Sequence, residues 1–574
     1  MRISEVHIKK FRSIKDGKIR LGDISAIVGE NNAGKTAILR AVNGIFNFEV
    51  EETSFLNKTH QHTKRSNSYI TVVFDDIPNE SVELQKHINN GTITIEFMYS
   101  YGENKRKLSI IKGTSKYNIP NIDLLICELN KYINYVYISS ERTNNDICWG
   151  NDTIFKKLLT EYINKHTKNR DNISSDIKKS SKKIKDNVLI KLEKNISELY
   201  MQNVNVNFKL DFPPNIDYTS ILHLVEMSIN ESESSYLLQE WGSGTKSLAI
   251  IAMHRALALI ENKSIILGIE EPETNLHPQA QKRFIQSLKA GMYDNEVQTI
   301  FTTHSTVLID ELDHGDIILV RRKKDNQRSF VSSVKQISDD FFVKNRINIS
   351  GHNNFFKIKN SDFFFAKHVI ICESPVDIYV IEKLISSELQ NNIADISFVD
   401  LGGVSNLNYP YFLMKELSIP FSVVVDYDYF FDYKNDELDV SRNSRGFPEY
   451  KNTVTTQSNK RLVLEDAFKK DLSKLENRYG YRDFFSITKK QRFYSLMYCL
   501  EMDLICSSAA CAEYYRVLNV REEDKTPWHL LVECKKTIKK RENILQVMNS
   551  LDNRHYPESL KKIKNALIED IKNL

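Results

Sequence analysis

Gly29-Glu30-Asn31-Asn32-Ala33-Gly34-Lys35-Thr36 is a GxxxxGKT stretch that decides the fold of the first part of this 574-residue chain. It lies between a strand pattern at 24–28 and a helical pattern from 35 to 46. Glycines let such a loop wrap phosphate oxygens with backbone N–H groups, and the following helix directs its positive dipole end at them. We therefore expect an ATP-binding loop. Its expected ligands are Gly29, Asn31, Asn32, Gly34, Lys35 and Thr36.

Two side chains of this loop and two later carboxylates have distinct expected roles. Lys35 can bridge the β- and γ-phosphates, and Thr36 can ligate Mg²⁺. Much later, the apolar run 265–269 ends in Glu270 and Glu271. Because ligands of open α/β sheets bind at the carboxyl ends of strands, we expect Glu270 in the Mg²⁺ shell. Glu271 would orient or deprotonate the attacking water. The long separation of the two motifs predicts an insertion between them.

Two further segments complete the predicted ATPase. Trp241-Gly242-Ser243-Gly244 opens a helical pattern, and a loop of small residues at a helix N-terminus is a second phosphate cradle. Its expected phosphate ligands are Ser243 and Gly244. His304 follows the apolar segment 297–301, which places it at a strand end. We expect His304 to sense the phosphate.

In this order, the four elements resemble the ABC-type ATPase heads of the SMC and RecF class. The resemblance implies that Ser243 and Gly244 contact the γ-phosphate of a nucleotide held by a partner subunit. It therefore implies a head-to-head dimer. Glu270 stands where that class usually has Asp, and the extra methylene is expected to shift the Mg²⁺ shell and slow turnover.

A second set of carboxylates follows three strand patterns in the C-terminal part. Glu373 ends the strand pattern 368–372, and Asp377 opens the helix after it. Asp426 and Asp428 follow the strand pattern 421–425, and their spacing puts both carboxylates on one side of an extended segment. Such an oxygen-rich site suits Mg²⁺ or Mn²⁺, which can activate water for phosphodiester hydrolysis.

With a Gly402-Gly403 turn between them, these motifs resemble the Toprim domain of topoisomerases, primases and certain nucleases. The fusion with an ATPase head resembles the overcoming-lysogenization-defect (OLD) family of ATP-dependent nucleases, which includes Gabija-type and retron-associated defence nucleases. The resemblance covers nearly the whole chain and is loosest in the last ~100 residues. It implies that Glu373, Asp426 and Asp428 hold one metal ion.

The same resemblance implies that Asp377 and Glu465 hold a second metal ion and that a C-terminal lysine steadies the phosphate or the leaving group. Lys540 is the best positional match for that lysine, and Lys535, Lys536 and Lys539 remain alternatives. The first Toprim Glu is usually followed by Gly, but here Ser374-Pro375 follow it. The turn can still form, because Pro suits the first turn of a helix. Val463 replaces the usual Asp, so one-metal cutting or a site completed by Asp466 stays open.

The composition limits which binding partners and which cellular location we expect. The net charge is only +4, so a DNA-binding surface must be a local patch. None of the seven cysteines forms a CxxC pair, which argues against a zinc ribbon and a disulfide framework. The sequence shows no signal-peptide pattern and no apolar run of the ~18 residues that a membrane helix needs. We expect a cytoplasmic protein without membrane contact.

The expected fold class is α/β: a P-loop ATPase of the ABC type, then a Toprim domain with helical additions. The expected ranges are 1–150 and 203–340 for the ATPase parts, 151–202 for a helical insert, 341–365 for a connector and 366–574 for the Toprim domain. The insert is rich in lysine. It is either a solvated helical hairpin or an arm that contacts DNA or forms the dimer, and the family resemblance favours dimerisation.

The functional hypothesis is an ATP-regulated, metal-dependent DNA endonuclease, a homodimer or higher even oligomer that serves antiphage defence. A helicase or a reverse-transcriptase complex with its msDNA is a conceivable partner. The alternative is a RecF- or SMC-like DNA-binding clamp or sensor, in which the Toprim fold is a degenerate interaction module. The acidic set formed by Glu373, Asp377, Asp426 and Asp428 argues for the nuclease.

Overall fold

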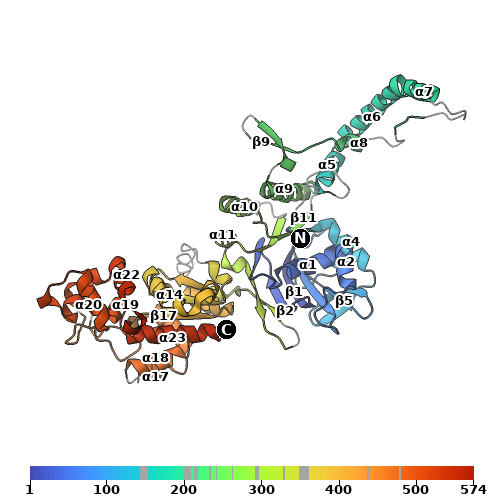
Figure 1. Ribbon diagram of the computed structural model, residues 1–574. Coiled ribbons are helices and arrows are strands. Elements are labelled where there is room, and N and C mark those ends of the chain that lie inside the picture. Colours follow the sequence, from blue (N-terminus) through green and yellow to red (C-terminus); the bar gives the residue numbers. More distant parts are fainter. Residues whose placement is uncertain are drawn as a thin grey trace. The chain divides into compact units, whose positions relative to one another are not determined.

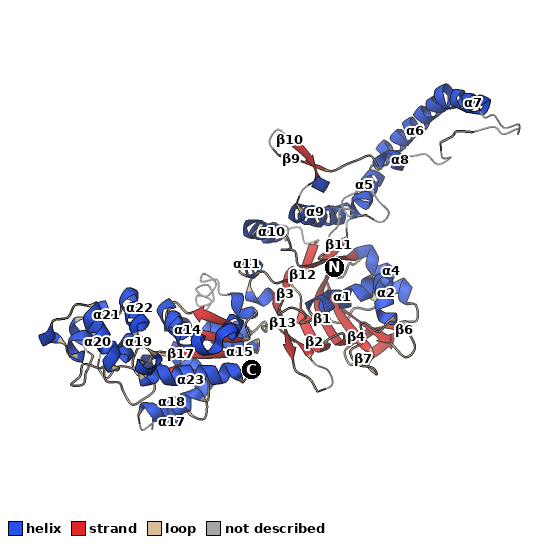
Figure 2. Cartoon of the chain, viewed as in Figure 1, coloured by secondary structure: helices blue, strands red, loops and turns tan. Residues whose placement is uncertain are grey.

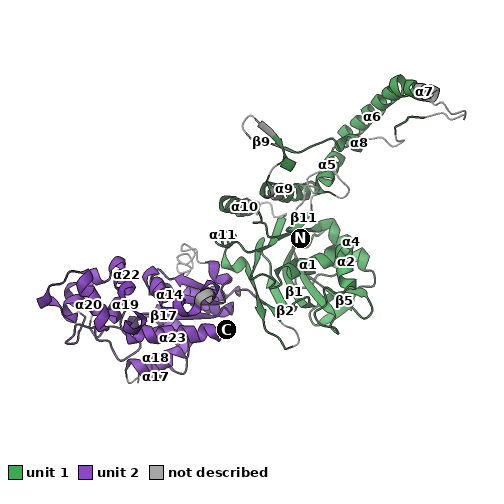
Figure 3. Ribbon diagram, viewed as in Figure 1, with its two compact units in different colours: residues 1–334 green, residues 335–574 purple. Residues whose placement is uncertain are grey.

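The computed structural model divides into two compact units, Met1–Val334 and Lys335–Leu574 (Figure 3). The domain ranges expected from the sequence stay predictions at this level of detail. The residues that the structure describes are 1–141, 153–199, 209–212, 218–231, 234–240, 242–261, 263–290, 297–326, 330–347, 361–435, 440–476 and 480–573.

A 12-stranded sheet forms the centre of the first unit in its described part (Figures 1 and 2). The strands follow the order β7-β6-β5-β4-β1-β2-β14-β13-β3-β12-β11-β8. Their bounds are β1 Arg2–Phe11, β2 Ile14–Arg20, β3 Ile24–Val28, β4 Ser68–Asp75, β5 Ile93–Ser100, β6 Lys105–Lys112, β7 Ser115–Asn118, β8 Ile133–Ile138, β11 Ser264–Glu270, β12 Val297–Thr303, β13 Ile317–Lys323 and β14 Val331–Lys335.

The sheet joins an antiparallel part to a parallel part. Strands β1, β2 and β4–β7 pair antiparallel, and their side chains alternate in burial as expected for strands with one face toward a core. Strands β13, β3, β12, β11 and β8 run parallel. β3 is buried at every position, because parallel strands are covered on both faces. The carboxyl ends of β3, β11 and β12 therefore meet at one edge.

Helix α1, Lys35–Phe46, follows the GxxxxGKT loop and packs its apolar face on the sheet. Its neighbours on this side are α2 (Phe48–Leu56), α3 (Val82–Gln85) and α4 (Ile122–Tyr132). Beyond β11 the chain forms α10 (Pro278–Ala290), α11 (Thr306–Ile309) and a 3₁₀ turn at His314–Asp316.

The predicted lysine-rich insert is helical and extends away from the sheet of its unit (Figure 1). It comprises α5 (Ile154–Lys165), α6 (Thr167–Ile184), a π-helical turn (Lys185–Leu189) and α7 (Ile190–Leu199). After it come α8 (Thr219–Leu222), the hairpin β9 (Ser228–Glu231) and β10 (Ser234–Leu237), a 3₁₀ turn (Leu238–Glu240) and α9 (Ser243–Glu261).

The second unit holds a four-stranded parallel sheet in the order β16-β15-β17-β18. The bounds are β15 His368–Cys372, β16 Ile396–Asp400, β17 Phe421–Val425 and β18 Phe493–Ser495. Two elements precede the sheet in the chain: α12 (Phe341–Lys344) and a 3₁₀ turn (Ser361–Phe364). The connections between the strands contain α14 (Pro375–Leu389), 3₁₀ turns at Gln390–Asp395 and Val404–Asn406, α15 (Asn408–Glu416) and a 3₁₀ turn at Tyr427–Tyr429.

Helices follow in the C-terminal part: α16 (Ser458–Phe468), α17 (Leu472–Glu476), α18 (Tyr481–Lys489), α19 (Leu500–Ile505), α20 (Ser508–Val517), α21 (Lys535–Ile538), α22 (Arg541–Ser550) and α23 (Glu558–Lys572), with short turns at Glu522–Asp524, His529–Glu533 and Asn553–His555. One apolar core joins this part to the sheet, through α14, α19, α20, α22 and α23. Across the described residues, no helix combines the length and apolar character needed to cross a membrane.

Candidate functional site

The GxxxxGKT loop surrounds its lysine. Lys35 is only 6% exposed, and its Nζ donates to the main-chain oxygens of Gly29 and Glu30, both at 3.0 Å. It also donates to Nε2 of His304 at 2.7 Å, so the structure brings together two residues that the sequence predicted from motifs far apart. Burial lowers the pKa of Lys35 to about 8, against the opposing influence of Glu271 and other nearby carboxylates.

Close backbone packing explains both glycines of this loop. Gly29 has φ 148°, and a Cβ there would lie 1.9 Å from the carbonyl oxygen of Val320. Gly34 has φ 106°, and a Cβ there would lie 2.4 Å from Oγ of Ser332 and 2.6 Å from Oγ of Ser13. The loop is thus held by the β1–β2 turn and by β14, so a side chain at either glycine would push it out of position.

The two carboxylates predicted at the end of β11 face different surroundings. Glu270 is 8% exposed and lies near the phenol of Tyr137, whose pKa is raised by burial and by Glu270. Glu271 is half-buried, has φ 42°, and donates its N–H to the carbonyl oxygen of Thr302 at 3.0 Å. A left-handed backbone is uncommon outside glycine, and here it turns Glu271 out of the strand, toward Lys35.

Glu273 is a functional residue that the sequence reasoning did not assign. Its Oε1 accepts hydrogen bonds from Oγ1 of Thr303 at 2.8 Å and from the backbone N–H of His304 at 2.7 Å. Burial raises its pKa. The third carboxylate of the Glu-Glu-Pro-Glu run therefore fixes the backbone that carries His304. The Glu-Glu-Pro-Glu run is the sequence feature from which a role for Glu273 could have been predicted.

The predicted second cradle lies against the segment after β11 in the same chain. A Cβ on Gly244 would lie 2.5 Å from the main-chain oxygen of Asn275 and 2.8 Å from Leu276. Glycine is therefore required by close packing at this helix start. The side chain of Ser243 lies outside the described atoms. The contact of Ser243 and Gly244 with a partner's nucleotide stays a prediction.

A buried charged network lies behind the ATP-binding loop and was not predicted. Glu51 and His60 are fully buried, and His60 Nε2 lies 2.8 Å from Glu51 Oε2. Nε of Arg12 donates to Nδ1 of His60 at 3.0 Å, and Arg40 lies 3.3 Å from Glu51. The guanidinium of Arg40 also lies 5.3 Å from the ring centroid of Tyr137, which lies near Glu270. The network thus ties the β1–β2 turn to the base of the carboxylate site.

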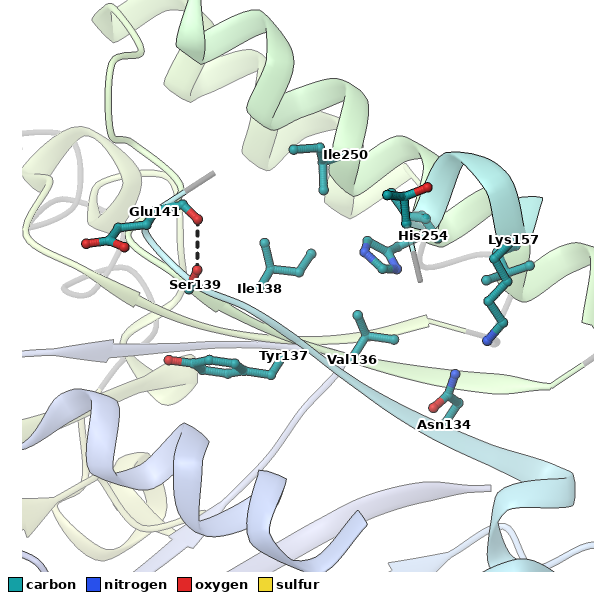
Figure 4. A pocket seen from close by; sticks show the side chains of 12 residues that line it. Asn134, Val136, Tyr137, Ile138, Ser139, Glu141, Lys157, Ile250 and His254 are labelled. Carbon is teal, nitrogen blue, oxygen red and sulfur yellow. Dashed lines mark hydrogen bonds between the residues drawn. The ribbon is translucent and has the colours of Figure 1, made fainter. Parts of the chain in front are cut away.

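A cavity of about 310 Å³ opens beside β8 and is lined by β8, α5 and α9 (Figure 4). Val136, Ile138 and Ile250 form apolar walls, and His254 and Lys157 contribute nitrogen atoms. Burial lowers the pKa of His254 to about 4, so its imidazole is neutral near pH 7. Lys35 and Glu270 do not line this cavity, which is therefore distinct from the predicted ATP site.

In the second unit, the sheet brings the predicted nuclease carboxylates together. Glu373 follows β15, and Asp426 and Asp428 follow the neighbouring strand β17. Asp377 lies in the first turn of α14, where its Oδ2 accepts a hydrogen bond from Ser374 Oγ at 2.7 Å. Carboxyl ends of parallel strands meet at one sheet edge, which explains how residues 55 positions apart become neighbours (373 to 428).

The Gly402-Gly403 turn holds the first of these carboxylates. Gly403 has φ 122° and donates its N–H to the main-chain oxygen of Glu373 at 3.2 Å. The N–H of Val404 donates to the Glu373 side chain. The other carboxylate oxygen of Glu373, Oε2, is buried and has no hydrogen-bond partner among the described residues. It is therefore directed at a place where a cation would bind favourably.

Mutual repulsion marks these carboxylates as a cation site. Burial raises the pKa of Glu373 to about 7, and nearby Asp428 and Asp377 act in the same direction. Burial also raises the pKa of Asp426 well above its usual range, with Asp377, Glu373 and Asp428 adding to the effect. A divalent cation would remove this repulsion, and oxygen donors suit Mg²⁺ or Mn²⁺.

The donor set therefore fits a hard divalent cation, although its geometry is not yet closed around one. No group of three His, Cys, Asp or Glu side chains within the described ranges is already arranged to hold a metal ion. The assignment of a divalent-cation site rests on three observations. These are the oxygen donors, the buried Oε2 of Glu373 and the crowding of negative charge. Rotation of these side chains would be required on binding.

Glu465, predicted with Asp377 for the second metal, and Lys540, predicted as the catalytic lysine, are both exposed. Glu465 is exposed on α16, where its Oε1 accepts from Nε of Arg461 at 2.8 Å. Asp466 accepts from the hydroxyl of Tyr411 at 2.8 Å and from Lys415. Lys540 is exposed at the start of α22. No contact among the described residues joins Glu465 or Lys540 to Glu373, Asp426 or Asp428.

Two other residues border the carboxylates: Glu501, which the sequence did not indicate, and Lys539. Glu501, on α19 beyond β18, is 7% exposed and raises the pKa of Asp377 and of Asp426. Nζ of Lys539 lies 3.1 Å from Oε1 of Glu501, and Asp426 helps to raise the pKa of Lys539. Lys539 was one of the open alternatives to Lys540. The signal for Glu501 was weak, because β18 has only 3 residues.

A lysine on the opposite side of the site also contacts the acidic turn. Nζ of Lys460, in the first turn of α16, donates to the main-chain oxygen of Asp428 at 2.8 Å. Lys460 also opposes the rise in the pKa of Glu373. Cations from two different helices therefore border the carboxylates.

We expect Lys539→Met to slow phosphodiester cleavage by about 10²- to 10⁴-fold, the range of general acid–base contributions. Lys540→Met, one position further along the chain, should cleave at the wild-type rate because its side chain points to solvent. Single-turnover cleavage with both variants measures this difference. Equal rates for Lys539→Met and wild type, with loss in Lys540→Met, would reverse the assignment.

Comparisons with known proteins agree with the two units. A family model described as "AAA ATPase domain" matches residues 1–145 and 127–309. A model described as "Overcoming lysogenization defect protein-like, TOPRIM domain" matches residues 364–428. The second match contains Glu373, Asp377, Asp426 and Asp428, and the first contains every residue predicted to bind ATP.

Several curated proteins are similar over most of their length. The chain is 25% identical over 490 residues to an OLD nuclease of Thermus scotoductus, covering 80% of this chain and 88% of that protein. It is 24% identical over 464 residues to the Old nuclease of Escherichia phage P2, covering 75% and 78%. It is 22% identical over 493 residues to the endonuclease GajA of Bacillus cereus, covering 70% of each.

Solved SMC head domains are also similar. The SMC head domain of Thermotoga maritima is 16% identical, with a TM-score of 0.32, over 59% of this chain and 100% of that chain. An SmcHead bound to the C-winged helix domain of ScpA is 15% identical, with a TM-score of 0.38, over 60% and 100%. Such low TM-scores do not support a fold assignment, which rests on the sheets and on the family models.

Proposed function

The chain belongs to the AAA ATPase domain family and carries an OLD-like Toprim domain, and from this premise we propose that it is an ATP-regulated, divalent-metal-dependent DNA endonuclease. The observation that carries the proposal is the crowding of Glu373, Asp377, Asp426 and Asp428 at one edge of the Toprim sheet. Asp377 and Asp428 raise the pKa of Glu373, and all three raise the pKa of Asp426, so this crowding would be costly without a cation. The named nuclease relatives support DNA as the substrate.

The ATPase unit would bind and hydrolyse ATP with Mg²⁺. Lys35 and the loop N–H groups would hold the phosphates, Thr36 and Glu270 would ligate the metal, and Glu271 would orient the attacking water. His304, fixed by Glu273, would exchange its hydrogen bond with Lys35 for one to the γ-phosphate. The 2.7 Å contact between Lys35 and His304 supports this role, because both nitrogens already point to one place.

The Toprim unit would hold Mg²⁺ or Mn²⁺ through Glu373, Asp426 and Asp428, with Asp377 at a second position. A bound divalent ion would supply an activated water and stabilise charge on the scissile phosphate. Ser374 keeps the Asp377 carboxylate oriented through its hydroxyl. Lys539, held by Glu501, would donate a proton to the leaving oxygen or hold the phosphate.

We propose the remaining partners on the same basis. ATP would regulate access of DNA to the Toprim site, and a homodimer or higher even oligomer would form through the ATPase heads and the α5–α7 insert. The relative named GajA and the OLD nucleases favour a role in antiphage defence, in the cytoplasm. A helicase or a reverse-transcriptase complex with msDNA remains a proposed partner.

Nicking of supercoiled plasmid by the purified protein tests this function. We expect open-circular product in Mg²⁺ or Mn²⁺, no product in EDTA, and a change in rate when ATP is added. The rate of Lys35→Ala should not respond to ATP, because that variant loses the phosphate cradle. An intact plasmid in either metal, with and without ATP, would instead favour a DNA-binding clamp or sensor.

A further inference from the structure

A hairpin stands between the acidic turn after β17 and helix α16. Tyr433 and Tyr450 pair as an antiparallel bridge. The N–H of Lys434 donates to the carbonyl oxygen of Glu449, and the N–H of Lys451 donates to that of Asp432, both at 2.9 Å. We call residues 431–435 and 440–454 the aromatic hairpin. These backbone bonds give its rings fixed positions.

The rings of the aromatic hairpin form a ladder with Tyr498, which follows β18. Tyr433 stacks on Tyr450 with centroids 5.1 Å apart and planes at 24°. Tyr450 lies 6.4 Å from Tyr498, and Tyr498 stacks on Phe447 at 4.8 Å and 29°. The guanidinium of the exposed Arg445 lies 5.6 Å from the Phe447 centroid. The ladder thus runs from Tyr433 to a cation at its other end.

One end of this ladder lies beside the metal-site carboxylates. Tyr427, the residue between Asp426 and Asp428, has its ring 4.9 Å from that of Tyr450. The Asp428 and Asp426 carboxylates also act on the Tyr433 phenol, adding to the rise in its pKa that burial causes. Tyr433 and Tyr450 therefore lie near the carboxylates that would hold the metal ion.

Packing alone does not account for Tyr433. Its side chain is only partly exposed, and among the described residues Tyr450 is the one aromatic ring that it contacts. A phenol near two carboxylates gains nothing from their charge, and a phenylalanine would fill a purely apolar position better. A stacked aromatic ring that is partly exposed is a feature that proteins use to hold unpaired bases, whatever their sequence.

We propose that the Tyr433 end of this ladder is a binding site for an unpaired nucleobase next to the scissile phosphate. This inference rests on the proposed nuclease function and narrows its substrate. The preferred DNA has single-stranded character at the cut, as in a flap, a gap or a bubble. A fully paired duplex must unstack one nucleotide to fill the site, which costs free energy.

Binding of an oligonucleotide with one 2-aminopurine tests the site without any cleavage. The full-length protein is titrated, in Ca²⁺, into single strands and into a fully paired duplex of the same sequence. Stacking should quench the 2-aminopurine signal in the wild type. Tyr433→Ala should bind the single strand about 5- to 150-fold more weakly and leave the duplex affinity unchanged. Tyr433→Phe should retain both the affinity and the quench.

Two further variants keep the test decisive. Tyr433→Leu fills the space against Tyr450 without a ring and should fail as Tyr433→Ala does, even if the smaller side chain loosens the hairpin. Tyr515→Ala, on α20 and outside the ladder, should bind like the wild type. Unchanged single-strand affinity and quench in both Tyr433→Ala and Tyr433→Leu would overturn the site. Absence of plasmid nicking would overturn the nuclease function instead, because this titration requires no cleavage.

Discussion

Replacing both Asp426 and Asp428 with asparagine is expected to abolish nicking of supercoiled DNA in Mg²⁺ and in Mn²⁺, while ATP binding stays intact. An amide can still offer an oxygen atom but carries no charge, so a hard divalent cation loses most of its attraction to the site. The ATP-binding residues lie in the other compact unit, so their affinity for ATP should not change. Nicking and ATP-binding assays on the same purified double variant measure both effects.

Thermal unfolding without added metal provides a second readout of the same variant. In the wild type, the acidic neighbours of Asp426 raise its pKa, because each ionised carboxylate near it opposes its ionisation. Removing two of the charges should leave the unfolding temperature equal or higher in EDTA. Added Mn²⁺ should stabilise the wild type and not the variant, because ligands that bind the folded state raise its stability.

Glu465→Gln is the matched comparison for this experiment. Glu465 is exposed and paired with Arg461, and a surface ion pair of this kind contributes at most about 1 kcal/mol. We expect a smaller loss of nicking than in the double variant. Cleavage at the wild-type rate by Asp426→Asn/Asp428→Asn would place the chemistry elsewhere and make the clamp or sensor the better reading.

The prediction of the ATP site rests on local motifs. The GxxxxGKT loop, the carboxylates after β11 and the histidine after β12 each follow an apolar strand. A strand's direction decides which sheet edge its last residues reach. The contact between Lys35 and His304 follows from that rule once β3 and β12 are neighbours. The two family models confirm the ATPase and Toprim assignments.

Residues whose role depends on tertiary packing were missed, as Glu273 and Glu501 were, or left among several alternatives, as Lys539 was. Glu273 acts through the backbone of His304, and the sequence spacing does not show which carboxylate of a run turns inward. Glu501 and Lys539 approach the Toprim site only after the C-terminal helices pack on the sheet. The strand before Glu501 is too short to show the alternation of apolar and polar residues that predicts a strand. Side chains on separate helices meet through the core, which no local pattern describes.

The stacked rings of the aromatic hairpin also depend on tertiary packing and could not be predicted from the sequence. Tyr433, Phe447 and Tyr450 stand in a stretch whose sequence looks like an ordinary polar loop. The bridge between Tyr433 and Tyr450 sets their rings in a stack. A single-residue change in that register would turn the rings to opposite sides, because side chains alternate along an extended segment. The sequence therefore predicts a loop here but not the ladder.

Glu271→Gln is expected to bind ATP with wild-type affinity and to hydrolyse it at least ~10²-fold more slowly, the scale of general acid–base catalysis. The backbone N–H of Glu271 keeps its bond to Thr302, so the amide should occupy the same place. Its oxygen can accept a hydrogen bond from the water but cannot take its proton. Steady-state hydrolysis, together with equilibrium binding of ATP, separates the two effects.

Two variants of the same acidic run identify which carboxylate acts on the water. Glu273→Gln keeps a carbonyl oxygen that can accept from Thr303 and from the N–H of His304, so it should retain most of the hydrolysis. Glu270→Gln should weaken Mg²⁺ binding, so that hydrolysis needs more Mg²⁺, because an amide is a poorer ligand for this cation than a carboxylate. Normal turnover in Glu271→Gln, with loss of chemistry in Glu270→Gln, would exchange the two roles and make Glu270 the residue that activates water.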